Sequence, residues 1–133
     1  MNTKQVIVIR KDLQMRKGKM IAQGAHASMK VILDMMINNY EDEDYKGFSI
    51  GVIKGSPLEN WLLGIFTKVV VGCDSEEELL HLRFQAIDKN IPNAIIKDAG
   101  KTEFHSVPTF TALAIGPDEV SKIDEITGHL KLL

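Results

Sequence analysis

Four short apolar runs, each of a length typical of a β-strand, constrain the fold of this chain more than any other feature. The runs are residues 5–9, 68–73, 94–97 and 111–115. Segments with a helical pattern separate the first three runs, whereas only a loop separates the third from the fourth. Strands joined through a helix lie parallel by a right-handed crossover, and strands joined by a loop can pair antiparallel. The sequence therefore predicts one mixed sheet.

The order of the predicted elements is β-α-β-α-β-β-α, which is typical of an α/β fold with three layers, α/β/α. We expect a mixed four-stranded sheet flanked by helices on both faces. A length of 133 residues is sufficient for one hydrophobic core, so residues 1–133 are predicted to form a single domain. Within it, residues 39–66 carry acids and scattered glycines, and we expect an irregular, expanded segment with a short hairpin or one helical turn.

A long helical pattern follows the first run, from about residue 19 to residue 38. Its apolar stripe, at a spacing of 3.6 residues, is expected to face the sheet. The stripe consists of Ala22, Ala25, Met29, Ile32, Leu33 and Met36. His26 lies among the alanines of this stripe, where it is either a core residue with satisfied hydrogen bonds or a general base with room for a substrate beside it.

Composition and cysteine content narrow the class of protein. The chain is 44% hydrophobic and 26% charged, as in an ordinary globular protein. Its single cysteine, Cys73, excludes an internal disulfide and fits a reducing compartment. No run approaches the roughly 18 apolar residues that a membrane span needs, and no apolar signal region precedes the first strand. We therefore expect a cytoplasmic protein without membrane contact.

Charge is distributed unevenly along the chain, although the formal net charge is only −2. Residues 1–33 contain seven cations and one acid, a local balance of +6, whereas acids gather at 41–44 and 76–78. Such a bipolar surface can steer a polyanion to one face, although a solvated loop with scattered lysines has the same composition. Five of the cations lie close together in the sequence, namely Arg10, Lys11, Arg16, Lys17 and Lys19.

A second group of polar residues, Asp98-Ala99-Gly100-Lys101-Thr102, follows the third predicted strand. Its carboxylate, glycine turn, cation and hydroxyl are compatible with a site that positions water and equally with an ordinary polar turn. Because sites in α/β folds lie beyond the carboxyl ends of the strands, we expect this segment and residues 10–19 to share one edge of the sheet. The histidines and Cys73 show no metal-ligand spacing, so no metal is predicted.

Several motifs occur together and in register along the chain. The most specific are Met15-x-Lys17-Gly18-Lys19-x-x-Ala22-Gln23-x-x-His26-Ala27, the segment 98–102 and residues 111–117, with further matches at 6–13, 68–71 and 123–132. In this order they resemble the type 2 peptidyl-tRNA hydrolase family. Arg16 stands where that family has glycine, and Lys101 stands where it has arginine, which keeps the charge but loses the bidentate fork.

The resemblance implies a hydrolase that cleaves the ester bond between a peptide and the 3′ end of tRNA, its partner, and releases free tRNA for reuse. It implies a reaction without a metal or other cofactor. The catalytic candidates that it implies are Lys19, His26, Asp98 and Thr111. The candidates for binding substrate and tRNA are Arg10, Lys11, Arg16, Lys17, Gln23, Lys101 and Thr102.

The chemistry of an ester supports a hypothesis about the roles of these residues. Hydrolysis needs a positioned water, an acceptor for its proton and a donor for the developing oxyanion. We hypothesise that Asp98 and His26 position and deprotonate the water, while Lys19 or Thr111 stabilises the oxyanion. The cations of residues 10–19 would hold tRNA phosphates, which makes binding dependent on salt and largely indifferent to tRNA sequence.

Alternatives stay open at this point. The substrate could be peptidyl-tRNA, aminoacyl-tRNA or another acyl ester. A non-catalytic module that binds tRNA or protein, with residues 39–66 as its interface, would also fit, as would a hydrolase of small acyl esters. A homodimer formed through residues 39–66 is compatible with the sequence.

Overall fold

The computed structural model describes residues 1–100, 104 and 106–133. Its main strands are β1 (Thr3–Arg10), β4 (Lys68–Cys73), β5 (Asn93–Asp98) and β6 (Thr109–Glu119). They form one sheet in the order β4-β1-β6-β5. β1 pairs parallel with β4, and β6 pairs antiparallel with both β1 and β5. The predicted mixed four-stranded sheet, with an antiparallel last pair, is confirmed.

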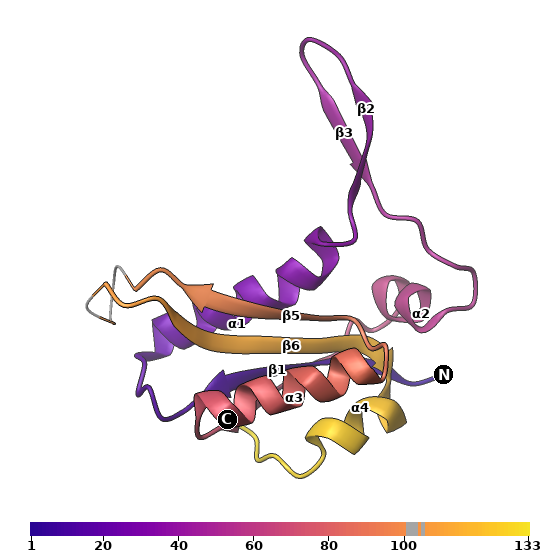
Figure 1. Ribbon diagram of the computed structural model, residues 1–133. Coiled ribbons are helices and arrows are strands. Elements are labelled where there is room, and N and C mark those ends of the chain that lie inside the picture. The colour runs from indigo at the N-terminus through magenta and orange to yellow at the C-terminus, as the bar shows by residue number, and fades with distance from the viewer. Residues whose placement is uncertain (101–103, 105) are drawn as a thin grey trace.

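Helices cover both faces of this sheet (Figure 1). α1 (Lys17–Leu33) packs against β1, β5 and β6 on one face, whereas α3 (Glu76–Asp88) and α4 (Val120–Thr127) lie side by side on the other. A shorter helix, α2 (Pro57–Leu63), also contacts β1 and β6. The layers therefore follow the predicted α/β/α order. Over the described part of the chain, no helix combines the length and apolar character needed to cross a membrane.

The two halves of the core differ in the size of their side chains. On the side of α3 and α4, large residues such as Leu79 and Ile115 are fully buried. On the side of α1, the sheet presents small residues, including Ala112 and Ala114. α1 can therefore approach the strands closely, and a Cβ built on Gly24 would lie 3.5 Å from the nearest atom of β1.

The face that α1 turns toward the sheet differs from the predicted stripe. Its buried residues are Gln23, Gly24, Ala27 and Val31. Ala25 and Met29, which were expected to be buried, are exposed, so that prediction is wrong. Apolar residues occupy most of the circumference of this helix, and close packing on the alanines of the sheet selects its smallest residues instead. The helix also ends earlier than predicted, at Leu33.

The segment expected to be irregular contains both a hairpin and a helix. β2 (Ile37–Glu41) and β3 (Lys46–Ser49) pair antiparallel in a sheet of their own. This hairpin projects away from the main sheet (Figure 1). α2 follows, anchored by the buried Trp61, whose indole N–H donates a hydrogen bond of 2.8 Å to the carbonyl oxygen of Thr67.

The C-terminal segment lies along the outer edge of β4. The N–H of Gly72 donates to the carbonyl oxygen of Lys131, and the N–H of Leu133 donates to that of Val70, both at 3.1 Å. Between them, Val71 and Leu132 form an antiparallel bridge. These contacts occupy part of an edge whose backbone groups would otherwise face solvent.

Candidate active site

The carboxyl ends of β1, β4 and β5 meet at one edge of the sheet. β1 and β4 are parallel, and β1 and β5 both run antiparallel to β6, so all three strands point the same way. α1 begins near this edge at Lys17, and β5 ends there at Asp98. The expectation that residues 10–19 and Asp98 share an edge is therefore confirmed.

Lys19 and Asp98 form the central contact at this edge. The Lys19 Nζ lies 2.9 Å from Asp98 Oδ1, and the two side chains are only 14% and 15% exposed. The other oxygen, Oδ2, accepts a hydrogen bond of 2.8 Å from the N–H of Gly100. Gly100 has a φ of +83°, and a Cβ there would lie 2.3 Å from the carbonyl oxygen of Val107, so the turn requires glycine. Both oxygens of Asp98 are thus held in fixed directions.

The contacts of Asp98 keep this carboxyl group ionised. Its pKa is lowered from the ordinary value of 3.8, first of all by the hydrogen bond from Lys19. The N–H of Gly100 and the charges of Lys19 and His26 lower the pKa further, whereas burial opposes them. A carboxylate with a lowered pKa is a weak base, so Asp98 is better suited to hold Lys19 than to deprotonate water.

His26 does not face the sheet, contrary to the expectation. The residue is exposed, while its neighbour Ala27 is buried against the strands. A positive charge on His26 contributes, as the smallest of the causes, to the lowered pKa of Asp98. Lys19 and His26 are about two helical turns apart, on nearly the same face of α1.

Thr111 reaches the α1 side of the sheet through a β-bulge. The pairing of β5 with β6 slips between Ile96 and Lys97, which leaves Thr111 as the additional residue on β6. Its hydroxyl donates a hydrogen bond to Gln23 Oε1, and the two residues are 0% and 2% exposed. The structure thus brings two predicted site residues together, but it buries the Thr111 hydroxyl behind Gln23.

Arg10 and Lys11 are engaged in ion pairs of their own. Ile9 belongs to the core on the α1 side, so strand alternation directs Arg10 to the opposite face of the sheet. There its guanidinium lies 2.6 Å from Asp12 and is largely buried. Lys11 pairs with Asp74 at 3.4 Å. The structure therefore does not bring Arg10 to the same face as the Lys19–Asp98 pair.

Arg16 and Lys17 lie at the start of α1, where both are exposed. Within the described residues, this helix begins without a side-chain cap and has no acid in its first turn. The first backbone N–H groups of a helix attract anions, and neighbouring cations strengthen that attraction. Two further candidates from the sequence, Lys101 and Thr102, lie outside the described residues.

Two contributors to the site were not predicted from the sequence. The first is the N–H of Gly100, for which the Asp-x-Gly spacing is a recognisable indication of a side-chain turn. The second is Phe104, whose ring centre lies 5.7 Å from the Lys19 Nζ, within the range of a cation–π contact. Nothing in the sequence around Phe104 indicates this contact.

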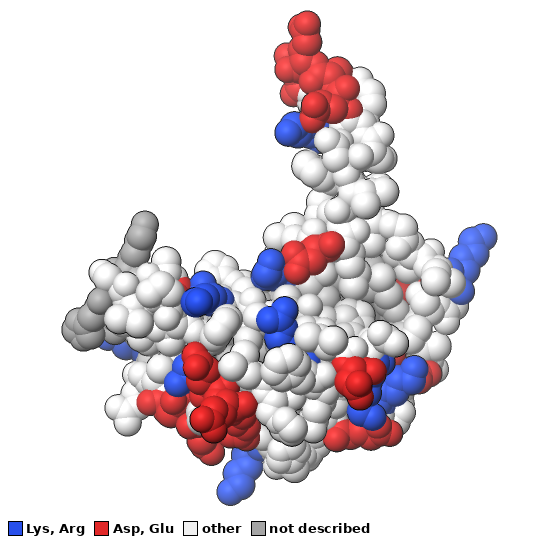
Figure 2. All heavy atoms as spheres, viewed as in Figure 1, with Lys and Arg blue, Asp and Glu red and all other residues white. Residues whose placement is uncertain are grey.

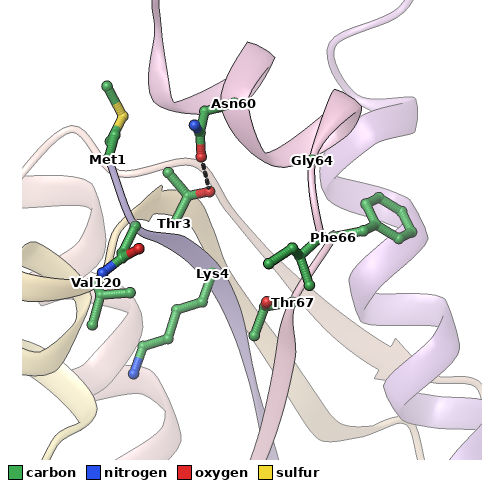
Figure 3. A pocket seen from close by; sticks show the side chains of 10 residues that line it. Met1, Thr3, Lys4, Asn60, Gly64, Phe66, Thr67 and Val120 are labelled. Carbon is green, nitrogen blue, oxygen red and sulfur yellow. Dashed lines mark hydrogen bonds between the residues drawn. The ribbon is translucent and has the colours of Figure 1, made fainter.

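A separate hollow of about 380 Å³ lies at the opposite end of the sheet, where β1 begins (Figure 3). Three of its polar side chains are already engaged: Thr3 Oγ1 donates to Asn60 Oδ1 at 2.7 Å, and Lys4 pairs with Asp124 at 2.6 Å. Among the described residues that line it, none is a histidine or a carboxylate. This hollow therefore offers no acid–base pair for catalysis.

Metal ligands and reactive thiols do not gather elsewhere in the described residues. No group of three or more His, Cys, Asp or Glu in that part of the chain could hold a metal ion. Cys73 is fully buried, and burial raises the pKa of its thiol to about 11. Such a thiol is protonated at neutral pH and is a poor nucleophile.

Comparison with known proteins gives consistent results for nearly the whole chain. Residues 3–133 match the family model described as peptidyl-tRNA hydrolase PTH2. The chain is 44% identical to a peptidyl-tRNA hydrolase of Methanocaldococcus jannaschii over 130 residues, covering 98% of this chain and 99% of that protein. It is 42% identical to a peptidyl-tRNA hydrolase of Sulfurisphaera tokodaii over 133 residues, covering 100% of both.

A solved structure shares the fold. It is a protein of unknown function from Agrobacterium, with a TM-score of 0.59 and 13% sequence identity. The match covers 100% of this chain and 98% of that one. At this identity the likeness concerns the arrangement of helices and strands alone.

Proposed function

This chain belongs to the peptidyl-tRNA hydrolase PTH2 family, and we propose that its active site is built around Lys19 and Asp98. The protein is a hydrolase of peptidyl-tRNA and cleaves the ester bond that joins a peptide to tRNA. The reaction requires a positioned water, an acceptor for its proton and a donor for the oxyanion. Described residues at the carboxyl edge of the sheet can supply each of these.

Lys19 is the proposed donor to the oxyanion. The observation that carries this assignment is the 2.9 Å contact between the Lys19 Nζ and the ionised Asp98, in a place where both side chains are largely shielded from water. A cation that is held in position before the reaction stabilises the developing negative charge, because no free energy is spent on reorienting the charged group during the reaction. Asp98 acts through Lys19 and is therefore a positioning residue.

His26 is the proposed proton acceptor. Both oxygens of Asp98 already accept hydrogen bonds, and the lowered pKa of Asp98 makes it a weak base. In the proposed step, the water oxygen attacks the ester carbonyl as its proton passes to the imidazole. The bond from the carbonyl carbon to the ribose oxygen then breaks, and that oxygen takes the proton back from His26.

Thr111 and Gln23 are proposed to position the helix that carries Lys19. Gln23 lies one turn after Lys19 on α1, and its hydrogen bond with Thr111 ties that turn to β6. Because both residues are buried, we assign them an indirect role through α1 rather than contact with the substrate. The catalytic contact is left to Lys19 and His26.

The start of α1 is proposed to bind tRNA phosphates. Arg16 and Lys17 are exposed there, beside the N-terminus of the helix. Lys101 and Thr102, which follow Asp98 in the sequence, are also proposed to bind the substrate or tRNA. Arg10 and Lys11, being held by Asp12 and Asp74, are proposed to shape the loop and to add to the local positive field.

We also propose a domain organisation, a cellular compartment and an oligomeric state for the protein. We propose that residues 1–133 act as one domain in the cytoplasm, because the substrate belongs to translation and Cys73 has no second cysteine to pair with. We further propose a homodimer formed through residues 39–66, where Tyr40, Tyr45 and Phe48 are exposed on the hairpin. Sedimentation of the wild-type chain tests the second proposal, and a monomer at all concentrations contradicts it.

Single-turnover cleavage of peptidyl-tRNA and of aminoacyl-tRNA, side by side, tests the site. Removing the oxyanion donor in Lys19→Ala is expected to slow cleavage by about 100-fold to 1,000-fold. His26→Ala is expected to slow it by at least about 100-fold, since a general base is lost. Asp98→Asn should also slow cleavage, because Lys19 loses its charged partner.

Lys30→Ala is the matched control. Lys30 lies on the same helix and also pairs with an aspartate, but both side chains of that pair are about half exposed, at 46% and 52%. The Lys30→Ala variant should cleave peptidyl-tRNA at the rate of the wild-type protein. Wild-type rates for folded Lys19→Ala and His26→Ala would rule out the proposed site.

A further inference from the structure

Phe104 presents an aromatic ring to the ammonium group of Lys19. The centre of the ring lies 5.7 Å from the Lys19 Nζ. The side chain is partly buried, and it packs against the hydrophobic core on the α1 side of the sheet, which includes Met15 and Ala112. The ring is therefore supported by the core and lies within the range of a cation–π contact with Lys19.

Backbone hydrogen bonds connect Phe104 to Asp98. The carbonyl oxygen of Phe104 accepts a hydrogen bond of 2.9 Å from the N–H of Val107, and that of Gly100 accepts one of 2.7 Å from the N–H of Ser106. The N–H of Gly100 in turn donates to Asp98 Oδ2. Asp98 and Phe104 thus belong to the same hydrogen-bonded connection between β5 and β6.

The contact with Phe104 restricts Lys19 in a way that Asp98 alone does not. A lysine ammonium group stands at the end of a flexible four-carbon chain, and one hydrogen bond to a carboxylate oxygen fixes only part of its position. The face of an aromatic ring attracts the same charge. Because the ring and the carboxylate occupy different places around the Nζ, the two attractions together restrict the ammonium group more than either does alone.

An aromatic ring is better suited to this task than a second acid would be. A second carboxylate would neutralise the charge of Lys19 and weaken its attraction for an oxyanion. The ring carries no net charge, so the charge of the ammonium group remains available to the developing oxyanion. The ring also excludes water, and electrostatic attraction is stronger where water is excluded.

We propose that Phe104 is a positioning residue for the cleavage of peptidyl-tRNA, and that the face of its ring holds the Lys19 ammonium group in place. This rests on the proposed function of the Lys19–Asp98 site. Phe104 acts through Lys19 and not through the substrate. Its loss should therefore lower kcat and leave KM nearly unchanged.

A series of fluorinated phenylalanines at position 104 tests the proposal. Fluorine atoms withdraw electrons from the face of the ring and weaken its attraction for a cation, while the shape of the side chain hardly changes. In steady-state cleavage of peptidyl-tRNA, kcat should fall stepwise as one, two and three fluorine atoms are introduced. The whole series should lower kcat by about two- to 30-fold.

Phe110 is the matched control for this series. Its ring centre lies 5.0 Å from the Lys97 Nζ, so it makes a similar contact with a lysine. Phe110 packs against the core on the opposite face of the sheet, on the side of α3 and α4. The same fluorinated residues at position 110 should leave kcat unchanged.

Ordinary substitutions separate a role through Lys19 from a role in packing. Phe104→Leu keeps an apolar side chain but loses the ring, and should lower kcat to a similar extent. Phe104→Tyr keeps the face of the ring and should retain the kcat of the wild-type protein. In a Lys19→Ala background, Phe104→Leu should cause no further loss, because the group that the ring holds is absent.

Four results would overturn the proposal. They are an unchanged kcat throughout the fluorinated series at position 104, an equal decline in the series at position 110, a rise in KM with kcat unchanged, and a full further loss from Phe104→Leu in the Lys19→Ala background. Each of them leaves the Lys19–Asp98 site in place, provided that Lys19→Ala itself is slow. A wild-type rate for Lys19→Ala would instead reject that site, and the role of Phe104 with it.

Discussion

Asp98 accepts hydrogen bonds from two donors, which explains why the sequence around it fits two interpretations. The N–H of Gly100 binds one carboxylate oxygen, as in an ordinary polar turn. Lys19, from a different element, binds the other oxygen. The turn at Gly100 fixes the carboxylate of Asp98, and that carboxylate then fixes the ammonium group of Lys19. The structural and the functional interpretations of Asp98 are therefore compatible.

The stability that Asp98 contributes should depend on pH. Its pKa in the folded protein lies below the ordinary value of 3.8, so the ionised form favours the folded state. The contribution is complete above that ordinary value and is lost as the pH falls through the lowered pKa. Asp98→Asn should therefore destabilise the protein by about 1–3 kcal/mol at neutral pH, and the difference from wild type should shrink below about pH 4.

Urea unfolding followed by circular dichroism over a pH series measures this difference. Asp34→Asn is the matched control, since Asp34 forms an exposed pair with Lys30 that should contribute no more than about 0.5 kcal/mol. A difference between wild type and Asp98→Asn that stays constant from neutral pH to pH 3 would show that the charge of Asp98 does not stabilise the fold.

Among the elements, the strands were predictable and the orientation of α1 was not. β1 is a continuous apolar run because both its faces are covered. β4 is a similar apolar run, although Val70 in it is 37% exposed. Such runs are recognisable in any sequence. α1 has apolar residues around most of its circumference, so its pattern could not identify the buried face. Gly24 and Ala27 are buried because they are small enough to pack closely against the alanines of the sheet. The sequence of the helix alone carries no information about those alanines.

For the candidate site, the sequence predicted which residues share an edge of the sheet but not the direction of every side chain. The topology placed Lys19 and Asp98 at one edge, and the structure pairs them. The direction of Thr111 depends on a bulge that shifts the pairing by one residue, and strand alternation alone cannot reveal it. The direction of Arg10 does follow from alternation along β1, since Ile9 faces α1.

The β2–β3 hairpin should be dispensable for the fold. Every residue of β2 is exposed, and the two strands pair only with each other. Replacing residues 37–49 by a short Gly/Ser linker should therefore change the free energy of unfolding by less than about 1 kcal/mol. Cleavage of peptidyl-tRNA should persist, because the hairpin lies beyond the end of α1 opposite to Lys19.

Urea unfolding and a cleavage assay on the shortened protein check this prediction. Trp61→Ala provides the contrast, since it removes a buried aromatic side chain of α2 and should cost about 3–5 kcal/mol. A shortened protein that loses its cooperative unfolding would mean that the hairpin supports the core.

At the scale of the whole molecule, opposite charges lie at separate places. Acidic side chains gather at the tip of the β2–β3 hairpin, formed by residues 41–44 (Figure 2). The cations of residues 10–19 lie at the carboxyl edge of the sheet. A polyanion is therefore attracted to the edge that holds Lys19 and Asp98 and repelled from the hairpin, although the net charge is only −2.

Binding of tRNA should therefore weaken with salt. The logarithm of the binding constant should fall linearly with the logarithm of the salt concentration. Lys17→Ala should lower affinity equally for different tRNA sequences and reduce the slope by about 0.7–0.9, because one phosphate contact is lost. Filter binding at several salt concentrations gives both quantities.

Lys46→Ala on the hairpin is the control for this measurement. Lys46 is exposed but lies beside Glu41, within the acidic region. Its removal should leave the slope unchanged. Equal changes for Lys46→Ala and Lys17→Ala would mean that tRNA responds only to total charge.

The C-terminal segment affects the tendency of the protein to aggregate at high concentration. β4 is an outer strand with three consecutive valines, a composition that readily templates pairing between chains and leads to aggregates. The backbone of residues 131–133 occupies the hydrogen-bonding groups of Val70 and Gly72 on that strand. This short segment therefore blocks part of the edge of β4 and so reduces pairing between the β4 strands of two molecules.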